Sequence, residues 1–283
     1  MTKIVALSGR KSSGKNTLSN YLHGHEMKRH DVIEQFQLGE QGELVVNCTF
    51  VDNNGKEFEE MGVLDLNQNN DQFFQYAAHR IWPLIRQYSF ADSLKEMCVM
   101  LFNIPPECVY GTDDQKNRIQ EHLLWENMPG VITCPELWDH IHPDGESEYG
   151  LTYHAEGPMT AREFMQYLGT EVMRKIYGPV WIENCLRRIE TDQPPIAVIT
   201  DCRFVNEVEA IHEVGGKVVR LTRKAFEDSH ASEKDTDGYE GFDAVVDNQE
   251  MSIDQSAEHF LEILVEFGYT QKLRKSTASF TKI

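Results

Sequence analysis

The chain has 283 residues, a formal net charge of −19 at pH 7 and 40% hydrophobic residues. This length and hydrophobic content allow one large α/β domain with a sizeable core. The negative charge argues against sequence-independent binding of nucleic acid, which needs a basic surface. No stretch approaches the roughly 18 apolar residues that a membrane span requires. We therefore expect a cytoplasmic protein with neither nucleic-acid nor membrane partners, in which a few convergent basic groups bind any anionic substrate.

Six cysteines are scattered through the chain, at positions 48, 98, 108, 134, 185 and 202. They form no CxxC pair and no cysteine–histidine cluster with the spacing of a zinc site. This pattern is typical of small buried side chains in a reducing cytoplasm. Residues 1–8 contain a short apolar run without a small-residue cleavage site, so we interpret them as a buried strand and not as a signal peptide.

Strands and helices alternate along most of the sequence. The apolar run at 3–8 predicts a first strand, and Leu18, Tyr21 and Leu22 fall on one face of the helix that follows. A strand over 88–91 and a helix over 94–102, ended by Pro105-Pro106, are predicted next. A capping box at Thr160 opens a further helix, with Phe164, Leu168 and Val172 inward. The remaining predicted elements are strands over 196–200, 217–221 and 244–246 and helices over 206–214 and 253–267. This alternation predicts a three-layer α/β fold with a mostly parallel sheet flanked by helices.

Two stretches interrupt the pattern and are interpreted as insertions into a single domain spanning 1–283. The first, at about 26–70, contains an apolar strand followed by an Asn-Gly turn, which predicts a hairpin. The second, at about 121–158, is acidic and aromatic, and no Lys or Arg occurs between Arg118 and Arg162. A solvated acidic face is our main interpretation of it, and a lid or a partner-binding surface is the alternative.

A phosphate-binding motif follows the first strand and opens the first helix. Residues 9–17 read Gly-Arg-Lys-Ser-Ser-Gly-Lys-Asn-Thr, which matches the P-loop pattern G-x-x-x-x-G-K in its required context. Glycines allow the backbone N–H groups to face a phosphate, and the helix N-terminus adds partial positive charge. Lys15 would contact the β- and γ-phosphates of ATP. The predicted ATP-binding residues are Gly9, Lys11, Ser12, Ser13, Gly14, Lys15, Asn16 and Thr17. The alternative is a glycine-rich turn with a chance lysine.

The residue after the P-loop lysine is Asn16, where many P-loop proteins have the Ser or Thr that holds magnesium. The hydroxyl comes one position later, at Thr17. We therefore expect Mg²⁺ to be held by Thr17, by Asn16 or through water on Asp201.

The P-loop and four further blocks resemble, in the same order, the bacteriophage deoxynucleoside monophosphate kinases. The blocks are Phe90–Lys95, Tyr110–Asn117, Thr160–Glu171 and Ile199–Glu207, and together with the chain between the last two they cover over half of the sequence. The resemblance implies a nucleoside monophosphate kinase fold, ATP with magnesium, and certain deoxynucleoside monophosphates as acceptors. It also implies a location in the host cytoplasm if the protein is of phage origin. A homodimer is compatible with the sequence.

Phosphoryl transfer needs positioning and positive charge, and several residues are candidates for these roles. Asp201 follows a buried strand, and the carboxyl ends of strands bind ligands in open α/β sheets. Arg203 could bind a phosphate through both branches of its guanidinium. Arg162 opposes the dipole of its own helix, which suggests that it serves the acceptor phosphate. Together with Lys15, these three are the predicted catalytic residues. The structural alternatives are a helix N-cap for Asp201 and an ion pair with Glu207 for Arg203.

The remaining candidates would bind the two nucleotides. For the acceptor, the predicted residues are Asp92, Lys95, Arg162, Gln166, Gly169, Thr170, Glu171 and Trp181. The alternative for Asp92 and Lys95 is an i,i+3 ion pair. The alternative for Trp181 is a position in the hydrophobic core. Close approach of a sugar or base would explain Gly169. By resemblance to nucleoside monophosphate kinases, Arg187 or Arg188 would belong to a closing lid. Arg223 is predicted to stack on the adenine of ATP.

Two other functions remain open at this point. The first is a P-loop kinase of another phosphorylated small molecule, such as phosphomevalonate or dephospho-coenzyme A. The second is a nucleotide-binding protein without catalysis, which Asn16 would favour. Intact Lys15, Asp201 and Arg203 argue against the second.

Overall fold

The computed structural model describes residues 1–51, 57–68, 70–141, 151–223, 236 and 238–273. They pack as two compact units, of which unit 1 comprises Met1–Phe90 and Asn184–Ile283 and unit 2 comprises Ala91–Glu183. The sequence predicts one domain with two insertions. The structure instead keeps the first insertion within unit 1, while the second is part of a larger unit that closes its own hydrophobic core.

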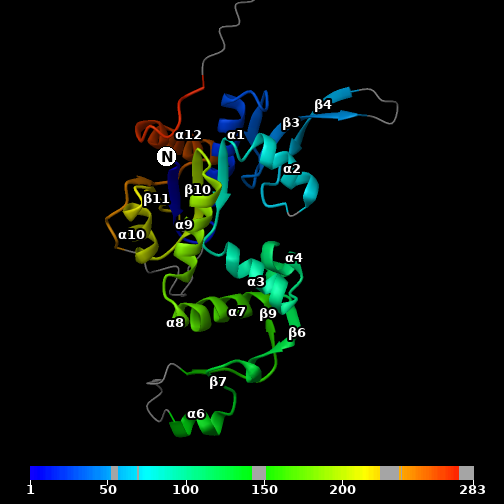
Figure 1. Cartoon of the computed structure of the whole chain (residues 1–283), viewed down its shortest axis with the longest axis vertical. Coiled ribbons are helices and arrows are strands. Elements are labelled where there is room, and N and C mark those ends of the chain that lie inside the picture. The colour runs from blue at the N-terminus through cyan, green and yellow to red at the C-terminus, as the bar shows by residue number, and fades with distance from the viewer. Residues whose placement is uncertain (52–56, 69, 142–150, 224–235, 237, 274–283) are drawn as a thin grey trace, which may run out of the picture. The chain divides into compact units, whose positions relative to one another are not determined.

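The centre of unit 1 is a five-stranded sheet in the order β12-β11-β1-β10-β5, and all four neighbouring pairs are parallel (Figure 1). This confirms the predicted α/β fold with a parallel sheet. The strand bounds are β1 Lys3–Ser8, β5 Ile85–Tyr88, β10 Ile196–Cys202, β11 Lys217–Leu221 and β12 Ala244–Val246. Strand β5 ends where the sequence predicts a strand to begin, because Ser89 and Phe90 leave the sheet and bind the carboxylate of Asp201.

Helices cover both faces of this sheet, as a three-layer fold requires. Side chains alternate along β1, so Val5 and Leu7 pack into the core beneath helices α1 (Lys15–Arg29) and α12 (Ile253–Glu266), which lie side by side in Figure 1. Ile4 faces the opposite way, toward Ile211 of α10 (Val205–Glu213). Helix α9 (Val180–Asp192) covers the same opposite face, where the hydroxyl of Tyr88 donates a hydrogen bond of 2.9 Å to Asp192.

The first insertion forms a three-stranded antiparallel sheet, which confirms the predicted hairpin. Its strands are β2 Phe36–Leu38, β3 Leu44–Val51 and β4 Glu57–Val63, followed by helix α2 Asp71–Arg80. The predicted Asn-Gly turn at 54–55 lies outside the described residues. This sheet packs on α1 at Gly24, where a Cβ atom would lie 2.7 Å from Cγ of Phe36 and 2.8 Å from Cδ1 of Leu44. A glycine at this position therefore allows the insertion to approach the helix.

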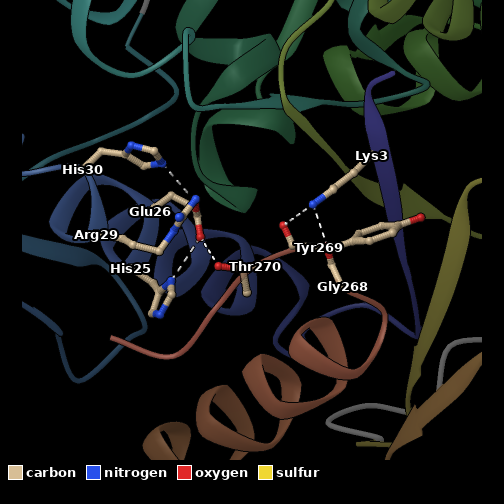
Figure 2. Close-up of polar contacts among 8 residues, drawn as sticks. All are labelled: Lys3, His25, Glu26, Arg29, His30, Gly268, Tyr269 and Thr270. Atoms are coloured by element: carbon tan, nitrogen blue, oxygen red, sulfur yellow. Dashed lines mark hydrogen bonds and ion pairs between the residues drawn. The ribbon is translucent and has the colours of Figure 1, made fainter. Parts of the chain in front are cut away.

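The segment after α12 is fixed to the beginning of the chain by two polar clusters (Figure 2). The ammonium of Lys3 donates to the carbonyl oxygens of Gly268 at 2.6 Å and Tyr269 at 3.3 Å. The fully buried carboxylate of Glu26 accepts the hydroxyl of Thr270. Arg29 donates to the same carboxylate at 2.6 Å, and His25 lies 3.2 Å from it. Polar side chains of β1 and α1 thus anchor this segment.

Unit 2 consists mainly of short helices and two pairs of short strands, one antiparallel and one parallel. Its elements are α3 Asp92–Phe102, α4 Pro106–Tyr110, α5 Asp113–Lys116, β6 Ile119–Leu124, η1 Trp125–Asn127, β7 Val131–Ile132, α6 Pro135–Ile141, β8 Thr152–Tyr153, β9 Pro158–Thr160, α7 Ala161–Gln166, η2 Tyr167–Met173 and α8 Arg174–Ile176. Strand β6 pairs with β9 and buries Leu123 and Met159 in the core of the unit. Part of the second predicted insertion therefore contributes to the hydrophobic core of unit 2. Leu101 of α3 is 68% exposed.

The helix that opens at Thr160 departs from a regular α-helix. Thr160 and Glu163 form the predicted capping box, and α7 then passes into a π-helical segment at Tyr167–Met173. The wider turn shifts the helical phase, so Leu168 stays buried while Val172 is only partly buried. Segments of this kind are frequent at functional sites.

Two predictions from composition can be compared with the structure. Within the described residues, none of the helices combines the length and hydrophobicity needed to cross a bilayer. Cys98, Cys108, Cys185 and Cys202 are buried thiols as predicted. Cys134 is exposed, because it lies just before the surface helix α6, where its thiol contacts Glu136.

Candidate functional site

The P-loop has the backbone conformation that its sequence predicts. Gly9 and Gly14 adopt positive φ angles of 152° and 102°, which L side chains rarely tolerate. A Cβ atom at Gly9 would lie 2.6 Å from Oγ of Ser13 and 3.0 Å from the carbonyl oxygen of Leu221. Helix α1 begins at Lys15, directly after Gly14. The loop therefore turns tightly from the end of β1 into a helix N-terminus, the arrangement that binds phosphate.

Lys15 folds back over the loop that precedes it. Its side chain is only 8% exposed, and its Nζ donates to the carbonyl oxygens of Gly9 at 2.6 Å and Arg10 at 2.7 Å. A third contact, 3.4 Å long, reaches Oγ of Ser13. The ammonium group is thus held inside the loop, where bound phosphates would carry their negative charge.

Asp201 lies at the same edge of the sheet as the P-loop. Strands β1 and β10 are parallel neighbours, with Ser8 opposite Cys202, and the helices that follow them, α1 and α10, cover opposite faces. A point where the following helices diverge in this way is the usual ligand site of an open α/β sheet. The Asp201 carboxylate accepts the hydroxyl of Ser89 at 2.5 Å and the N–H of Phe90 at 2.8 Å. These contacts differ from those of a helix N-cap, the structural alternative.

Charged groups of both signs surround the buried thiol of Cys202 next to Asp201. Burial raises the pKa of this thiol well above its ordinary value, and the negative charges of Glu207 and Asp201 raise it further. The positive charges of Arg220 and Lys15 act on it in the opposite direction. The P-loop lysine and Asp201 therefore share one electrostatic environment at this edge of the sheet.

Arg203 begins the turn into α10, and its backbone is fixed by a buried acid. Glu207 is 2% exposed, and its Oε2 accepts the N–H groups of Arg203 at 2.8 Å and Phe204 at 3.1 Å. The structural alternative for Arg203 is an ion pair with Glu207, and in the structure Glu207 binds the backbone N–H of Arg203 as part of a helix-capping interaction. The half-buried side chain of Arg203 follows Asp201 by two residues.

The residues predicted to hold magnesium differ in their surroundings. Asn16 is exposed on the first turn of α1, whereas Thr17 packs against Gly42 in the turn between β2 and β3. Within the described ranges, no three His, Cys, Asp or Glu side chains cluster closely enough to hold a metal ion by themselves. Mg²⁺ typically binds one or two protein oxygens together with substrate phosphates and water. That Thr17, Asn16 or Asp201 holds Mg²⁺ therefore stays a prediction.

Arg223 has a different environment from the one predicted. Its guanidinium donates to the carbonyl oxygens of Asn248 at 3.1 Å and Met251 at 2.6 Å, and its backbone N–H donates to Oδ1 of Asn248 at 2.9 Å. Asn248 in turn donates to the carbonyl oxygen of Ser13 in the P-loop at 2.8 Å. These contacts link Arg223 to the P-loop through Asn248, and stacking on adenine stays a prediction.

In unit 2, Arg162 lies in a small polar cluster. Its Nη2 is 2.6 Å from Oδ1 of Asp113, and its Nε donates to Oδ1 of Asn117 at 2.9 Å. The unfavourable position of Arg162 in its helix is therefore offset by a carboxylate on α5. Gln166, one turn further along α7, is exposed.

Gly169 and Trp181, two predicted acceptor residues, lie in the interior of unit 2. A Cβ atom at Gly169 would lie 2.8 Å from Cδ2 of Leu94, so packing against α3 accounts for this glycine without a sugar or base. Trp181 is 5% exposed, and its indole N–H donates to the Gly169 carbonyl at 3.1 Å, which favours its core alternative. Thr170 is exposed, and Glu171 pairs with Lys175 at 2.8 Å.

The remaining predicted residues lie on helices. Lys95 and Asp92 approach to 3.9 Å, which confirms the alternative of an i,i+3 ion pair, and the Lys95 ammonium also lies 5.7 Å from the centre of the Tyr110 ring. On α9, Arg187 is exposed and Arg188 is half-buried. A lid role for these arginines stays a prediction.

Comparison with known proteins gives one consistent family. A model of the deoxynucleotide monophosphate kinase family matches residues 143–258. A protein of Acanthamoeba polyphaga mimivirus, named as a candidate deoxynucleotide monophosphate kinase, is 26% identical over 177 residues, which cover 56% of this chain and 73% of the relative. A deoxynucleoside-5'-monophosphate kinase of Escherichia phage T5 is 23% identical over 152 residues, 46% of this chain and 60% of the relative. The chain is similar to the deoxynucleotide monophosphate kinase family over these residues.

The family match and the P-loop come from different parts of the chain. Residues 143–258 contain Arg162, Asp201 and Arg203, whereas the P-loop lies outside this range. Pairing of β1 with β10 brings the P-loop and Asp201 to one edge of the sheet. The part of the matched region that contains Asp201 and Arg203 therefore lies together with the P-loop in unit 1.

Three polar partners at these sites were not predicted from the sequence. Asp113 and Asn117 hold Arg162, and Asn248 holds the P-loop. Asn248 follows the predicted strand over 244–246, so its position at the carboxyl end of a strand was a usable signal. Asp113 and Asn117 belong to a block that resembles the kinase family, but their partner could not be read from the sequence.

Proposed function

We propose that this chain transfers the γ-phosphate of ATP to deoxynucleoside monophosphates, which yields deoxynucleoside diphosphates and ADP. The observation that carries the proposal is the coincidence of two signals at one sheet edge. Asp201 and Arg203 lie within the region matched by the deoxynucleotide kinase family, and the P-loop lies on the neighbouring strand. A kinase of this family needs both an ATP site and charged groups at the reacting phosphates.

The transfer itself requires little covalent chemistry from the protein. An oxygen of the acceptor phosphate forms a bond to the γ-phosphorus as the bond to the β–γ bridging oxygen breaks, and ADP departs with that electron pair. Lys15 compensates the negative charge on the β- and γ-phosphates, and the P-loop N–H groups bind their oxygens. Arg203 serves the transferring phosphate from the neighbouring strand.

Magnesium bound to the phosphates of ATP would further neutralise their charge. Asp201 would hold the ion, directly or through water, and the hydroxyl of Thr17 would complete the protein contribution. Ser89 and the N–H of Phe90 already orient the Asp201 carboxylate. These contacts fix the carboxylate before any ligand arrives, which reduces the cost of binding.

The acceptor would be bound by residues of unit 2. Arg162 is the main candidate for its phosphate, with the exposed Gln166 one turn along the same helix as a candidate for the base. Asp113 and Asn117 hold the guanidinium in one orientation, which suits recognition of a single phosphate group.

The test is ADP release with ATP, magnesium and each of the four deoxynucleoside monophosphates beside their ribose counterparts. We expect turnover with some deoxynucleotides and little turnover with ribonucleotides. A chain that binds ATP but turns over none of these acceptors would contradict the proposal. Phosphomevalonate and dephospho-coenzyme A as acceptors would then separate another small-molecule kinase from a non-catalytic nucleotide-binding protein.

A further inference from the structure

The carbonyl oxygen of Ser13, inside the P-loop, is bound by a side chain that follows the edge strand β12. Nδ2 of Asn248 donates to this oxygen at 2.8 Å. Both residues are shielded from solvent, with Ser13 fully buried and Asn248 1% exposed. Since a buried hydrogen bond of this kind is costly to lose, the contact defines the backbone orientation at Ser13.

The orientation of the Asn248 amide is fixed by its other end. Its Oδ1 accepts the backbone N–H of Arg223 at 2.9 Å, which leaves Nδ2 to donate to Ser13. The guanidinium of Arg223 then binds the carbonyl oxygens of Asn248 and Met251. Donor and acceptor of the amide are both engaged, so the side chain cannot rotate without breaking two contacts.

The geometry of the peptide bond carries this constraint into the phosphate site. In a planar trans peptide the C=O of one residue and the N–H of the next point in opposite directions. The C=O of Ser13 points toward Asn248, so the N–H of Gly14 points away from Asn248. Gly14 has a φ of 102°, and a glycine in this region leaves the adjoining peptide free to rotate. Asn248 is the side chain that restrains that rotation.

We propose that Asn248 is a positioning residue for phosphate binding, which holds the Ser13–Gly14 peptide so that the N–H of Gly14 faces the phosphates of ATP. The proposal rests on the proposed function only in that the P-loop binds ATP. It assigns to Arg223 the role of holding Asn248 in place. It also gives the C-terminal part of the sheet a role in a motif located near the N-terminus.

The experiment compares the wild-type chain with Asn248→Ala and Asn248→Asp. Asn248→Ala removes the donor, and Asn248→Asp keeps the acceptor for Arg223 but places a carboxylate oxygen against the Ser13 carbonyl. Affinity for MgATP and for ADP is measured by calorimetry, and the KM values for ATP and for the acceptor are measured separately. We expect nucleotide affinity to fall by about 10-fold or more in both variants, with the acceptor KM unchanged.

Asn70→Ala is the matched control, because Oδ1 of Asn70 accepts the N–H of Phe73 at 2.8 Å as the N-cap of α2 and its Nδ2 donates to Gln68, so that both contacts are made to residues outside the P-loop. It should lower thermal stability and leave ATP affinity unchanged. In protein labelled with ¹⁵N-glycine, the Gly14 amide resonance should shift on ADP binding in the wild type and lose this shift in Asn248→Ala.

Unchanged ATP affinity in both Asn248 variants, or an equal loss in Asn70→Ala, would overturn the proposal. A wild-type chain that binds MgATP but phosphorylates no deoxynucleotide would refute the proposed kinase function alone. The binding comparison would still test Asn248 in that case.

Discussion

The ammonium nitrogen of Lys15 lies 2.6 Å from the carbonyl oxygen of Gly9, within the same loop. A second carbonyl, that of Arg10, lies 2.7 Å from it. The positive charge is therefore already inside the P-loop and already partly desolvated before a nucleotide binds. Phosphates that enter the loop would replace weak carbonyl acceptors with charged ones, which form stronger hydrogen bonds.

Replacement of Lys15 by Ala should abolish phosphoryl transfer and leave the fold intact. The side chain compensates charge in the transition state, and loss of a single such donor typically costs about 10²–10³-fold in kcat. Steady-state ADP release measures the loss, and circular dichroism with thermal unfolding checks the fold. A Lys15→Ala protein with near wild-type activity would refute the P-loop assignment.

Replacement of Arg162 by Ala should raise the KM of the acceptor by about 10- to 100-fold, the effect of one lost hydrogen bond between charged groups. The KM of ATP should change little. Arg162→Lys should recover only part of the loss, because lysine keeps the charge without the planar guanidinium. Asp113→Asn should have a smaller effect in the same direction, since Asp113 only orients the arginine. An acceptor KM that stays at the wild-type value in Arg162→Ala would remove Arg162 from the site.

The buried Glu26 should make the protein lose stability in acid. Burial by itself would raise the pKa of its carboxyl, but hydrogen bonds from His25, Arg29 and Thr270 outweigh burial and lower the pKa to about 2. The ionised form is therefore favoured in the folded state, by about 3 kcal/mol relative to an ordinary glutamate. This stabilisation is present above pH 4.5 and disappears as the pH falls toward 2. In Glu26→Gln, the free energy of unfolding should change less with pH across that interval. Urea unfolding at a series of pH values measures this dependence.

A second acid-sensitive group on α1 acts at higher pH. Burial lowers the pKa of His23 to about 4, and its Nδ1 lies 2.8 Å from the Ser19 carbonyl, so the neutral ring donates there. Because the unfolded chain binds this proton more readily, stability should fall as the pH decreases from 6.5 to 4. His23→Gln should remove this component and leave the one below pH 4.5. Identical pH profiles for the wild type and His23→Gln would contradict this division.

The contact between Gly24 and the inserted sheet should make Gly24→Ala destabilising, although alanine is the better helix former. A Cβ atom there would meet the Phe36 ring and Leu44, and overpacking of this kind costs about 1–3 kcal/mol. Thermal unfolding of Gly24→Ala, Phe36→Ala and the double variant would measure the coupling between the two positions. If the effects of the single changes simply add, the insertion does not dock at Gly24.

Sequence patterns predicted the strands of unit 1 well because parallel strands buried on both faces are continuous apolar runs. Strands β1 and β11 have the predicted bounds. The P-loop was equally clear, since its glycines and its lysine are adjacent in the chain. The role of its partner Asn248 was not apparent from the sequence, because the contact between Ser13 and Asn248 depends on strand order. Local sequence does not encode strand order.

Predictions were weaker in unit 2, where short elements share one small core. The π-helical segment at Tyr167–Met173 shifts the phase of a helix whose sequence is regular, and spacing alone cannot reveal such a shift. Gly169 illustrates the difficulty, since a glycine can serve a ligand or a neighbouring side chain. In the structure, its neighbour is Leu94.

Strand order also affects how the chain can fold while it is synthesised on the ribosome. The central strand β1 is synthesised first, but its partners β10 and β11 begin at Ile196 and Lys217. At about 5–20 residues per second, this apolar strand stays without its partners for roughly 10–40 s. Unit 2 is continuous from Ala91 to Glu183 and emerges within that interval, so it can fold first. The nascent chain therefore exposes its phosphate-binding segment to chaperones until almost all of the sheet has been translated.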